Sequence, residues 1–206
     1  MFSGQIEFSA DSRVPVRESK GVAFVHLSCC ISERLHLRSL KLEDTHPLFS
    51  LTDANREYLR QWLPWLDANL HPEDTRAFIE RSIENMQAGK ETVSAIFYDR
   101  TLVGLVGLHE VSWHHRSGCV GYWLSADYQG KGIMTRACQS MLDYGFATLK
   151  LNRIEICCAV NNARSVAVVK RLGLAYEGTL REAEWLYDHF VDWKVYSMLA
   201  HEWAIC

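Results

Sequence analysis

The sequence predicts an α+β domain built around a mixed β-sheet, and three observations support this. Residues 92–125 alternate apolar and polar side chains in a meander of strands, which we expect to pair antiparallel. A helical pattern over 133–149 leads to an apolar strand at 153–160, and this strand–helix–strand order implies one parallel pair. Two more strands fill most of 174–203, so strands and helices do not simply alternate along the chain.

The first half of the chain gives one strand and two helices. Residues 31–40 alternate as a strand does, and 41–59 carries leucines at helical spacing. A loop follows, because Pro64 breaks any helix there. Residues 72–88 form a clear amphipathic helix that begins with a proline and two acids and ends at Gly89.

The second half adds the remaining elements in order. A hairpin with its turn at Asp99-Arg100 is followed by a third strand of the meander, then the helix at 133–149 and the strand at 153–160. A short helix begins at an Asn cap and ends at Gly173. The last two strands are joined by a polar turn near 187–189. The predicted sheet is mostly antiparallel and flanked by about four helices.

Bulk properties limit the classes of protein that fit. A chain of 206 residues suits one domain, and a net charge of -3 gives no general attraction to nucleic acid or to an anionic membrane. The seven cysteines are odd in number and include no C-x-x-C, which favours a reducing cytosol over a disulfide framework. No apolar run is long enough for a transmembrane helix. Residues 1–30 are expected to be an N-terminal extension of uncertain structure, and 31–206 the folded domain.

The stretch Gln129-Gly130-Lys131-Gly132 lies directly before the helix at 133–149. Unpaired N–H groups at a helix start bind anions, and glycines allow a phosphate to approach closely, so residues 129–135 predict a pyrophosphate site. The spacing does not fit a Walker loop, and it matches only the first two glycines of a dinucleotide-binding motif. A helix-opening turn without a ligand is the alternative.

Two motifs together resemble the GNAT acetyltransferase superfamily. They are "YQGKGIMT", preceded by "GYWLS", and "NNARSVAVVKRLGL". In that family the pattern Gln/Arg-x-x-Gly-x-Gly/Ala binds the pyrophosphate of acetyl-CoA through backbone amides. Gln129 and Gly132 match it, whereas Met134 departs at the last position. The resemblance extends over about residues 31–203 and implies the GNAT fold, with acetyl-CoA as co-substrate and no metal.

Within the superfamily, "WLPWL", "LNRIEICCAVNNARS" and "EGTLREAEWLYDHFVDWKVYSML" resemble the Rim-type branch, which acetylates the N-terminal Ser or Ala of ribosomal proteins. The resemblance implies a cofactor site that combines the end of the meander, the glycine turn and the second motif: Trp123, Leu124, Ser125, Gln129, Gly130, Lys131, Gly132, Ile133, Met134, Thr135, Asn162 and Ser165. Backbone N–H groups near Trp123 to Ser125 would stabilise the oxyanion.

The resemblance also implies two catalytic side chains. Ser165 takes the position of the acid that protonates the departing thiolate, with Asn162 beside it on the pantetheine arm; plain capping of the helix by this segment is the alternative. Glu184 takes the position of the general base. Glu182 is two residues away and on a strand would share the same face, so the choice between the two glutamates is left open.

Several other conspicuous residues are given no role. His109, His114 and His115 lack the carboxylate or cysteine spacing of a metal site. Trp62 and Trp65 either form a lid over the substrate groove or anchor their loop. Tyr122 is expected to pack against the sheet. Three arginines are interpreted as surface charges: Arg60, Arg153 and Arg171.

The sequence therefore predicts a cytosolic N-acetyltransferase that transfers acetyl from acetyl-CoA to a primary amine, by direct attack of a protein N-terminal amine. Two alternatives stay open. One is acetylation of a small amine such as an antibiotic or polyamine, and the other is a non-catalytic acetyl-CoA-binding module. No nucleic-acid or membrane partner is expected, and the oligomeric state is open, with a homodimer among the options.

Overall fold

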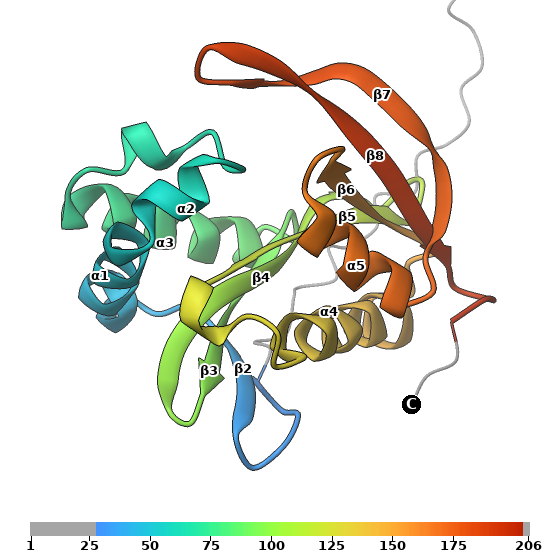
Figure 1. The fold of residues 1–206 in the computed structure, drawn as a ribbon. Coiled ribbons are helices and arrows are strands. Elements are labelled where there is room, and N and C mark those ends of the chain that lie inside the picture. The colour runs from blue at the N-terminus through green and yellow to red at the C-terminus, as the bar shows by residue number, and fades with distance from the viewer. Residues whose placement is uncertain (1–27, 204–206) are drawn as a thin grey trace, which may run out of the picture.

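The computed structural model describes residues 28–203, so most of the predicted N-terminal extension lies outside the described residues. Within that range the strands form one sheet of eight, in the order β1-β2-β3-β4-β5-β6-β8-β7 (Figure 1). The strands are β1 (Ser28–Cys30), β2 (Leu35–Ser39), β3 (Thr92–Tyr98), β4 (Thr101–Ser112), β5 (Ser117–Leu124), β6 (Arg153–Ala159), β7 (Ala175–Leu186) and β8 (His189–Leu199).

Five α-helices and four short turns of helix accompany these strands. The α-helices are α1 (Thr45–Ala54), α2 (Arg56–Arg60), α3 (Pro72–Gln87), α4 (Ile133–Asp143) and α5 (Ala163–Arg171). The short turns are η1 (Leu42–Asp44), η2 (Leu66–Ala68), η3 (Ala126–Tyr128) and η4 (Tyr144–Thr148). Within residues 28–203, no helix has both the length and the apolar character needed to cross a membrane.

The strand pairing confirms the predicted mixed sheet. β5 and β6 are parallel, and every other neighbouring pair is antiparallel. The hairpin turn between β3 and β4 lies at Asp99 and Arg100, both at positive φ, as a two-residue turn with right-handed strand twist requires. β1 is an edge strand that the sequence analysis did not predict, and it extends the sheet to residue 28.

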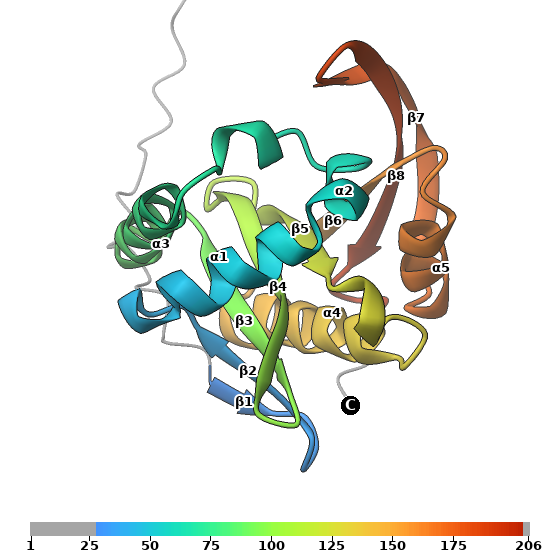
Figure 2. The same cartoon turned by 60° about the vertical axis from the view of Figure 1, so that its left-hand side comes forward.

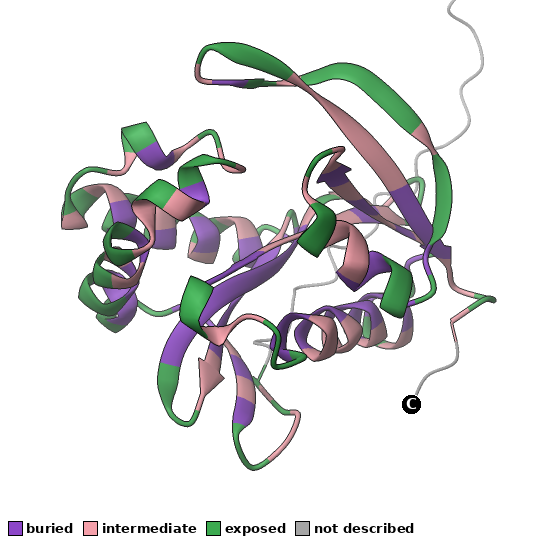
Figure 3. Cartoon of the chain, in the orientation of Figure 1, coloured by how far each residue is buried: buried purple, intermediate pink, exposed green. Residues whose placement is uncertain are grey.

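The sheet separates two apolar clusters. On what we call the α4 face, α4 and α5 pack against side chains of β4, β5 and β6, including Val106, Val120 and Ile156. On what we call the α3 face, side chains of α1 and α3 pack against β3, β4 and β5, including Leu105 and Trp123. Figure 2 shows β1 at one end of the sheet and the β7–β8 hairpin at the other. Most of that hairpin is exposed or half-buried, unlike the central strands (Figure 3).

Two predicted helices are each interrupted. The predicted helix over 41–59 breaks at Asn55, whose side chain donates to the carbonyl of Leu51 and accepts from the backbone N–H of Ala126. A side-chain amide that competes for backbone groups in this way ends a helix. The predicted helix over 133–149 is α-helical only to Asp143 and continues as the π-helical turn η4. There Gly145 lets the turn pack within contact of Ile154.

Gly104 fixes the approach of β4 to the end of β5. A Cβ at this position would lie 2.3 Å from the carbonyl oxygen of Trp123 and 2.9 Å from the Cα of Leu124. Both atoms belong to the backbone and cannot rotate away, so any side chain here must push β5 from its position.

We predict that Gly104→Ala lowers the free energy of unfolding by about 1–3 kcal/mol or more, because the added methyl overpacks two backbone atoms. Gly118→Ala is the matched control, since its Cβ would meet the flexible side chain of Leu108 at 3.0 Å. Urea unfolding of both variants checks this prediction. Equal free energies of unfolding for Gly104→Ala and Gly118→Ala would contradict it.

Candidate active site

The candidate site lies where β5 and β6 separate from each other. The two strands pair only over Ser117–Arg153, Gly118–Ile154 and Cys119–Glu155. Beyond these pairs, β5 continues to Leu124 along β4, and β6 continues to Ala159 along β8. Among residues 28–203, the inner edges of both strands therefore have no partner strand and border an opening in the middle of the sheet.

The predicted glycine turn lies just beyond the end of β5, directly before α4. Gly130 and Gly132 have φ values of +73° and +71°, which side chains rarely adopt, and Gly132 is the N-cap residue of α4. A Cβ added at either glycine would meet no heavy atom within 4 Å. Both glycines thus border open space, so the start of α4 is accessible and the turn fits a phosphate that approaches it.

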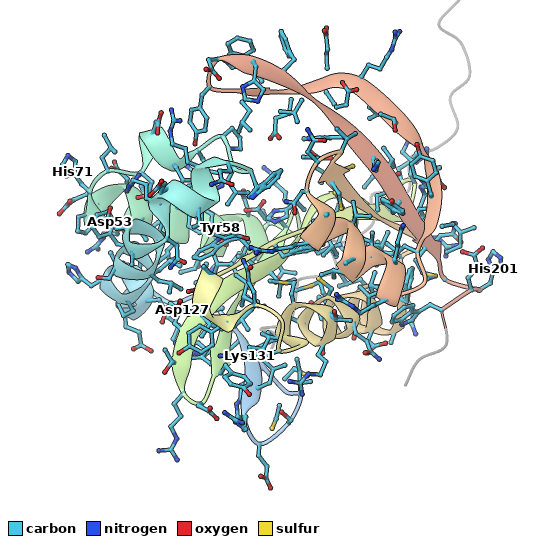
Figure 4. The ribbon with its side chains drawn as sticks, in the orientation of Figure 1. Asp53, Tyr58, His71, Asp127, Lys131 and His201 are labelled. Carbon is cyan, nitrogen blue, oxygen red and sulfur yellow. The ribbon has the colours of Figure 1, made fainter. Side chains whose placement is uncertain are left out.

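Side chains of the turn are held by its neighbours. Gln129 Nε2 donates to the hydroxyl of Tyr58 on α2 at 2.5 Å. Lys131 Nζ donates to the carbonyl of Asp127 at 3.0 Å and lies 4.7 Å from the ring centre of Tyr128. Figure 4 labels Tyr58, Asp127 and Lys131 around this turn. Lys131 is exposed, so a phosphate at the turn can reach its ammonium.

Arg171, interpreted above as a surface charge, lies beside the same turn. Its Nη1 donates to the hydroxyl of Thr135, in the first turn of α4, at 3.0 Å. The two residues are 36 positions apart, and only the packing of α5 against α4 brings them together. Arg171 thus joins Lys131 as a basic side chain near the start of α4.

The end of β5 leads from the strand into the turn. Trp123 is buried in the cluster on the α3 face, 6.5 Å from the ring of Trp65. Leu124 packs on the α4 face. Ser125 is buried, and its N–H donates to the carbonyl of Val103 at 2.8 Å. Ile133 and Met134 are also buried, so within the 129–135 motif they act in packing.

Ser165 lies in a small hydrogen-bonded network on the α4 face. Its N–H donates to Asn162 Oδ1 at 3.1 Å, so Asn162 caps α5 as expected. Its hydroxyl lies 2.8 Å from the hydroxyl of Tyr122 and 3.1 Å from Cys158 Sγ. Burial raises the pKa of Tyr122, so this phenol stays protonated and can donate to Ser165. The role of Tyr122 was missed because Tyr122 and Ser165 meet only across the parted strands.

Glu184 lies on β7, half-buried, where Oε2 accepts from Trp193 Nε1 at 3.2 Å. Burial raises the pKa of Glu184, and the hydrogen bond from Trp193 opposes this in part. A carboxylate with a raised pKa is suited to accept a proton near neutral pH.

The strand alternation from which Glu182 was expected to share the face of Glu184 is interrupted at this point. A bulge separates the pairs Leu180–Trp193 and Glu184–Val191, and Glu182 has a φ of +50° within it. The N–H of Glu182 donates to Asp192, and its side chain is exposed.

Ser165 and Glu184 approach the opening from opposite faces of the sheet. Ser165 contacts Cys158, which points to the α4 face, whereas Glu184 contacts Trp193, which pairs with Ala159, the next residue of β6. Successive residues of a strand point to opposite faces. Within the described residues the two side chains share no hydrogen bond, and they lie on opposite sides of the sheet.

The tip of the β7–β8 hairpin closes over the α3 face. The hydroxyl of Tyr187 donates to the carbonyl of Leu63 at 2.6 Å and accepts from the N–H of Leu66 at 3.3 Å. The guanidinium of Arg60 stacks 3.8 Å from the centre of the Tyr187 ring. A hollow of about 320 Å³ lies at this contact, between α2 and the hairpin turn.

Comparison with known proteins identifies the family. The model of the GNAT acetyltransferase domain family matches residues 34–175. The ribosomal-protein-serine acetyltransferase of Escherichia coli K12 is 30% identical, covering 82% of this chain and 94% of that protein. The spermidine N(1)-acetyltransferase of Escherichia coli K12 is 31% identical over 76% of this chain and 78% of its own. The structure of RimL, a ribosomal L7/L12 α-N-protein acetyltransferase in complex with coenzyme A, has a TM-score of 0.81 and 27% identity, covering 84% and 98% of the two chains.

This chain belongs to the GNAT acetyltransferase family and is an N-acetyltransferase that uses acetyl-CoA. The predicted fold class and family are confirmed. The accessible glycine turn before α4, with Lys131 and Arg171 beside it, fits the pyrophosphate of such a co-substrate.

We predict that Arg171→Ala weakens coenzyme A binding about fivefold, the effect of losing one exposed charge pair of roughly 1 kcal/mol. Titration calorimetry at low and high salt measures this, and the deficit should shrink as salt rises. Lys170→Ala is the control, because Lys170 is the exposed neighbour and has no contact with the turn among the described residues. Equal losses in the two variants would contradict a specific role for Arg171.

Proposed function

We propose that this enzyme acetylates the N-terminal amine of a protein, which reaches the opening from the α3 face. The observation that carries the proposal is the closure of that face by Tyr187. Its contacts with Leu63 and Leu66 join the hairpin turn to the loop after α2, and an acceptor has to pass beneath this bridge. A chain end is narrow enough to enter in this way. The similarity to ribosomal-protein acetyltransferases over nearly their full length supports the same acceptor class.

The donor is held from the α4 face. The amides of residues 130–135 and the side chains of Lys131 and Arg171 bind the pyrophosphate, and Asn162 contacts the pantetheine arm. Bound acetyl-CoA supplies the thioester, whose sulfur leaves as a thiolate. On the unpaired inner edge of β5, the N–H of Leu124 is offered to the carbonyl oxygen as it gains negative charge, because the N–H of Ser125 already donates to Val103 of β4.

Two side chains carry the proton transfers. Glu184, whose pKa is raised by burial, accepts a proton from the attacking amine on the α3 face. On the other face, the hydroxyl of Ser165 gives its proton to the departing sulfur and regains one from solvent, while Tyr122, hydrogen-bonded to it at 2.8 Å, stabilises the oxygen in between. The opening between β5 and β6 is where the two sides meet.

A thiol-release assay tests the acceptor class. Acetyl-CoA is offered with peptides that begin with Ser or Ala, with the same peptides blocked at the N-terminus, and with spermidine. The proposal predicts turnover on the free peptides alone. Turnover on spermidine with none on peptides would assign the enzyme to small amines instead, and tight acetyl-CoA binding without turnover on any amine would indicate a non-catalytic module.

Glu184→Gln is expected to lower kcat about 100-fold or more, because the general base is lost while the shape of the side chain is kept. The KM for acetyl-CoA should stay within about twofold, since the donor binds from the other face. Glu182→Gln is the matched control, because that side chain is exposed on the bulge. Steady-state kinetics that show the larger loss for Glu182→Gln would reverse the assignment.

The pH dependence of kcat follows from the raised pKa of Glu184. Only the ionised carboxylate accepts a proton, so the rate falls as pH decreases through this raised pKa. In Glu184→Gln that acidic limb is expected to disappear. Rate profiles from pH 5 to pH 9 check this, and a limb that persists unchanged in the variant would assign it to another group.

Tyr122→Phe is expected to lower kcat about 2–10-fold, the size of one hydrogen bond, by removing the donor to Ser165. The loss should nearly vanish in a Ser165→Ala background, because the two hydroxyls act through one chain of hydrogen bonds. A double-mutant cycle on kcat measures this coupling. Fully additive losses would show that the two residues act separately.

A further inference from the structure

His109 lies on the α3 face in a slot made by two glycines. Gly107 of β4 and Gly121 of β5 are paired directly across the strands. A Cβ at Gly107 would lie 2.6 Å from Nε2 of His109, and one at Gly121 would lie 3.4 Å from its Cδ2. The imidazole thus occupies the space that side chains at both positions would fill. Glycine weakens a strand interior, so this pair of glycines is costly and serves the placement of the ring.

The ring is oriented by Glu91. His109 Nδ1 lies 3.1 Å from Glu91 Oε2, and Asn85 Nδ2 donates to the other carboxylate oxygen at 3.0 Å. The hydrogen bond with His109 lowers the pKa of Glu91, so the carboxylate is ionised and can only accept. Nδ1 therefore carries the proton in neutral His109, and Nε2 keeps its lone pair. No side chain in residues 28–203 forms a hydrogen bond with Nε2.

The imidazole lies on the face of the sheet from which the acceptor amine is proposed to approach. Gly121, Trp123 and His109 all lie on the α3 face, and Trp123 is two residues beyond Gly121, about 7 Å along the strand. Beyond Cys119, β5 no longer pairs with β6, so the opening begins next to the imidazole. One or two water molecules are enough to bridge that distance.

The reaction needs two proton acceptors. An amine that enters as an ammonium loses one proton before its nitrogen can attack the thioester carbon. It loses a second proton as the C–N bond forms and the C–S bond breaks. One proton ends on the thiol of coenzyme A, through Ser165, and the other leaves to solvent. Glu184 accepts only one of the two in a single turnover.

We propose that His109 is the second acceptor: through water, Nε2 takes the proton that the ammonium loses before attack and passes it to solvent. Glu91 is the positioning residue that holds the proton of neutral His109 on Nδ1, which leaves Nε2 as the nitrogen that accepts. The inference rests on the proposed function in one respect, that the acceptor is an amine that approaches on the α3 face.

Other ionisable groups lie near this pair. Arg81 of α3 acts on Glu91 through its charge. Cys119 of β5 pairs with His109 across the strands and is hydrogen-bonded to Cys157 of β6. Glu110 is next to His109 on β4, and its charge helps keep the thiol of Cys119 protonated. Of these groups, Glu91 is the one in hydrogen-bond contact with the ring.

The pH dependence of His109→Ala tests the proposal. An α-amino group has a pKa of about 7.7–8.0, so it is mostly protonated at pH 7 and mostly neutral at pH 9.5. The variant should show kcat/KM about tenfold below wild type at pH 7 and within about twofold at pH 9.5. Added imidazole, which fits the vacated slot, should restore part of the rate at pH 7. Glu91→Gln should lower kcat/KM by a smaller factor at pH 7, and this loss should also shrink at pH 9.5.

The controls separate this role from packing. His36→Ala removes a half-buried histidine from β2, on the same face of the sheet, and should leave the rate unchanged. If His109→Ala lowers kcat/KM equally at all pH values and imidazole does not rescue the rate, the proposal is overturned and His109 is assigned to packing. Wild-type turnover is measured first with peptide amines and with spermidine. Turnover on neither would overturn the proposed function and this inference with it. If only spermidine is acetylated, the pH dependence of His109→Ala is measured with spermidine, whose amines have a higher pKa than an α-amino group.

Discussion

The separation of β5 from β6 after three pairs of residues is the constraint on which the site depends. A continuous sheet would satisfy the backbone groups of both strands and leave no route from one face to the other. Here β4 and β8 pair with the outer edges, and the inner edges stay open. This opening lets a donor on the α4 face and an acceptor on the α3 face reach one another. The same division explains why Ser165 and Glu184 have different hydrogen-bond partners.

Two sets of contacts maintain the opening. Gly104 allows β4 to approach the end of β5 closely, which directs Trp123 and Ser125 toward the turn before α4. On the other side, Tyr187 holds the β7–β8 hairpin against the loop after α2. In Figure 1 the hairpin arches from the sheet edge toward the α1–α3 side of the molecule. The hairpin is largely exposed, so these few contacts at its tip determine how it covers the α3 face.

Local patterns in the sequence were enough to predict the fold and part of the site. Gly130 and Gly132 precede a helix and adopt the positive φ values that only glycine favours, and Asn162 caps α5. Contacts made by tertiary packing were not predicted. Tyr122 meets Ser165 across parted strands, and Arg171 reaches Thr135 only because α5 packs on α4. Likewise, the bulge that separates Glu182 from Glu184 has no glycine or proline to indicate it, so strand alternation was assumed through it.

The central claim is that the opening between β5 and β6 holds the donor, with its phosphates at the turn before α4. A crystal structure of the enzyme with coenzyme A tests this directly. The account predicts pyrophosphate oxygens within about 2.7–3.2 Å of the amide nitrogens of residues 130–135, with the pantetheine arm between β5 and β6 and its sulfur near Ser165. A coenzyme bound elsewhere, or with its sulfur outside the opening, would contradict the account.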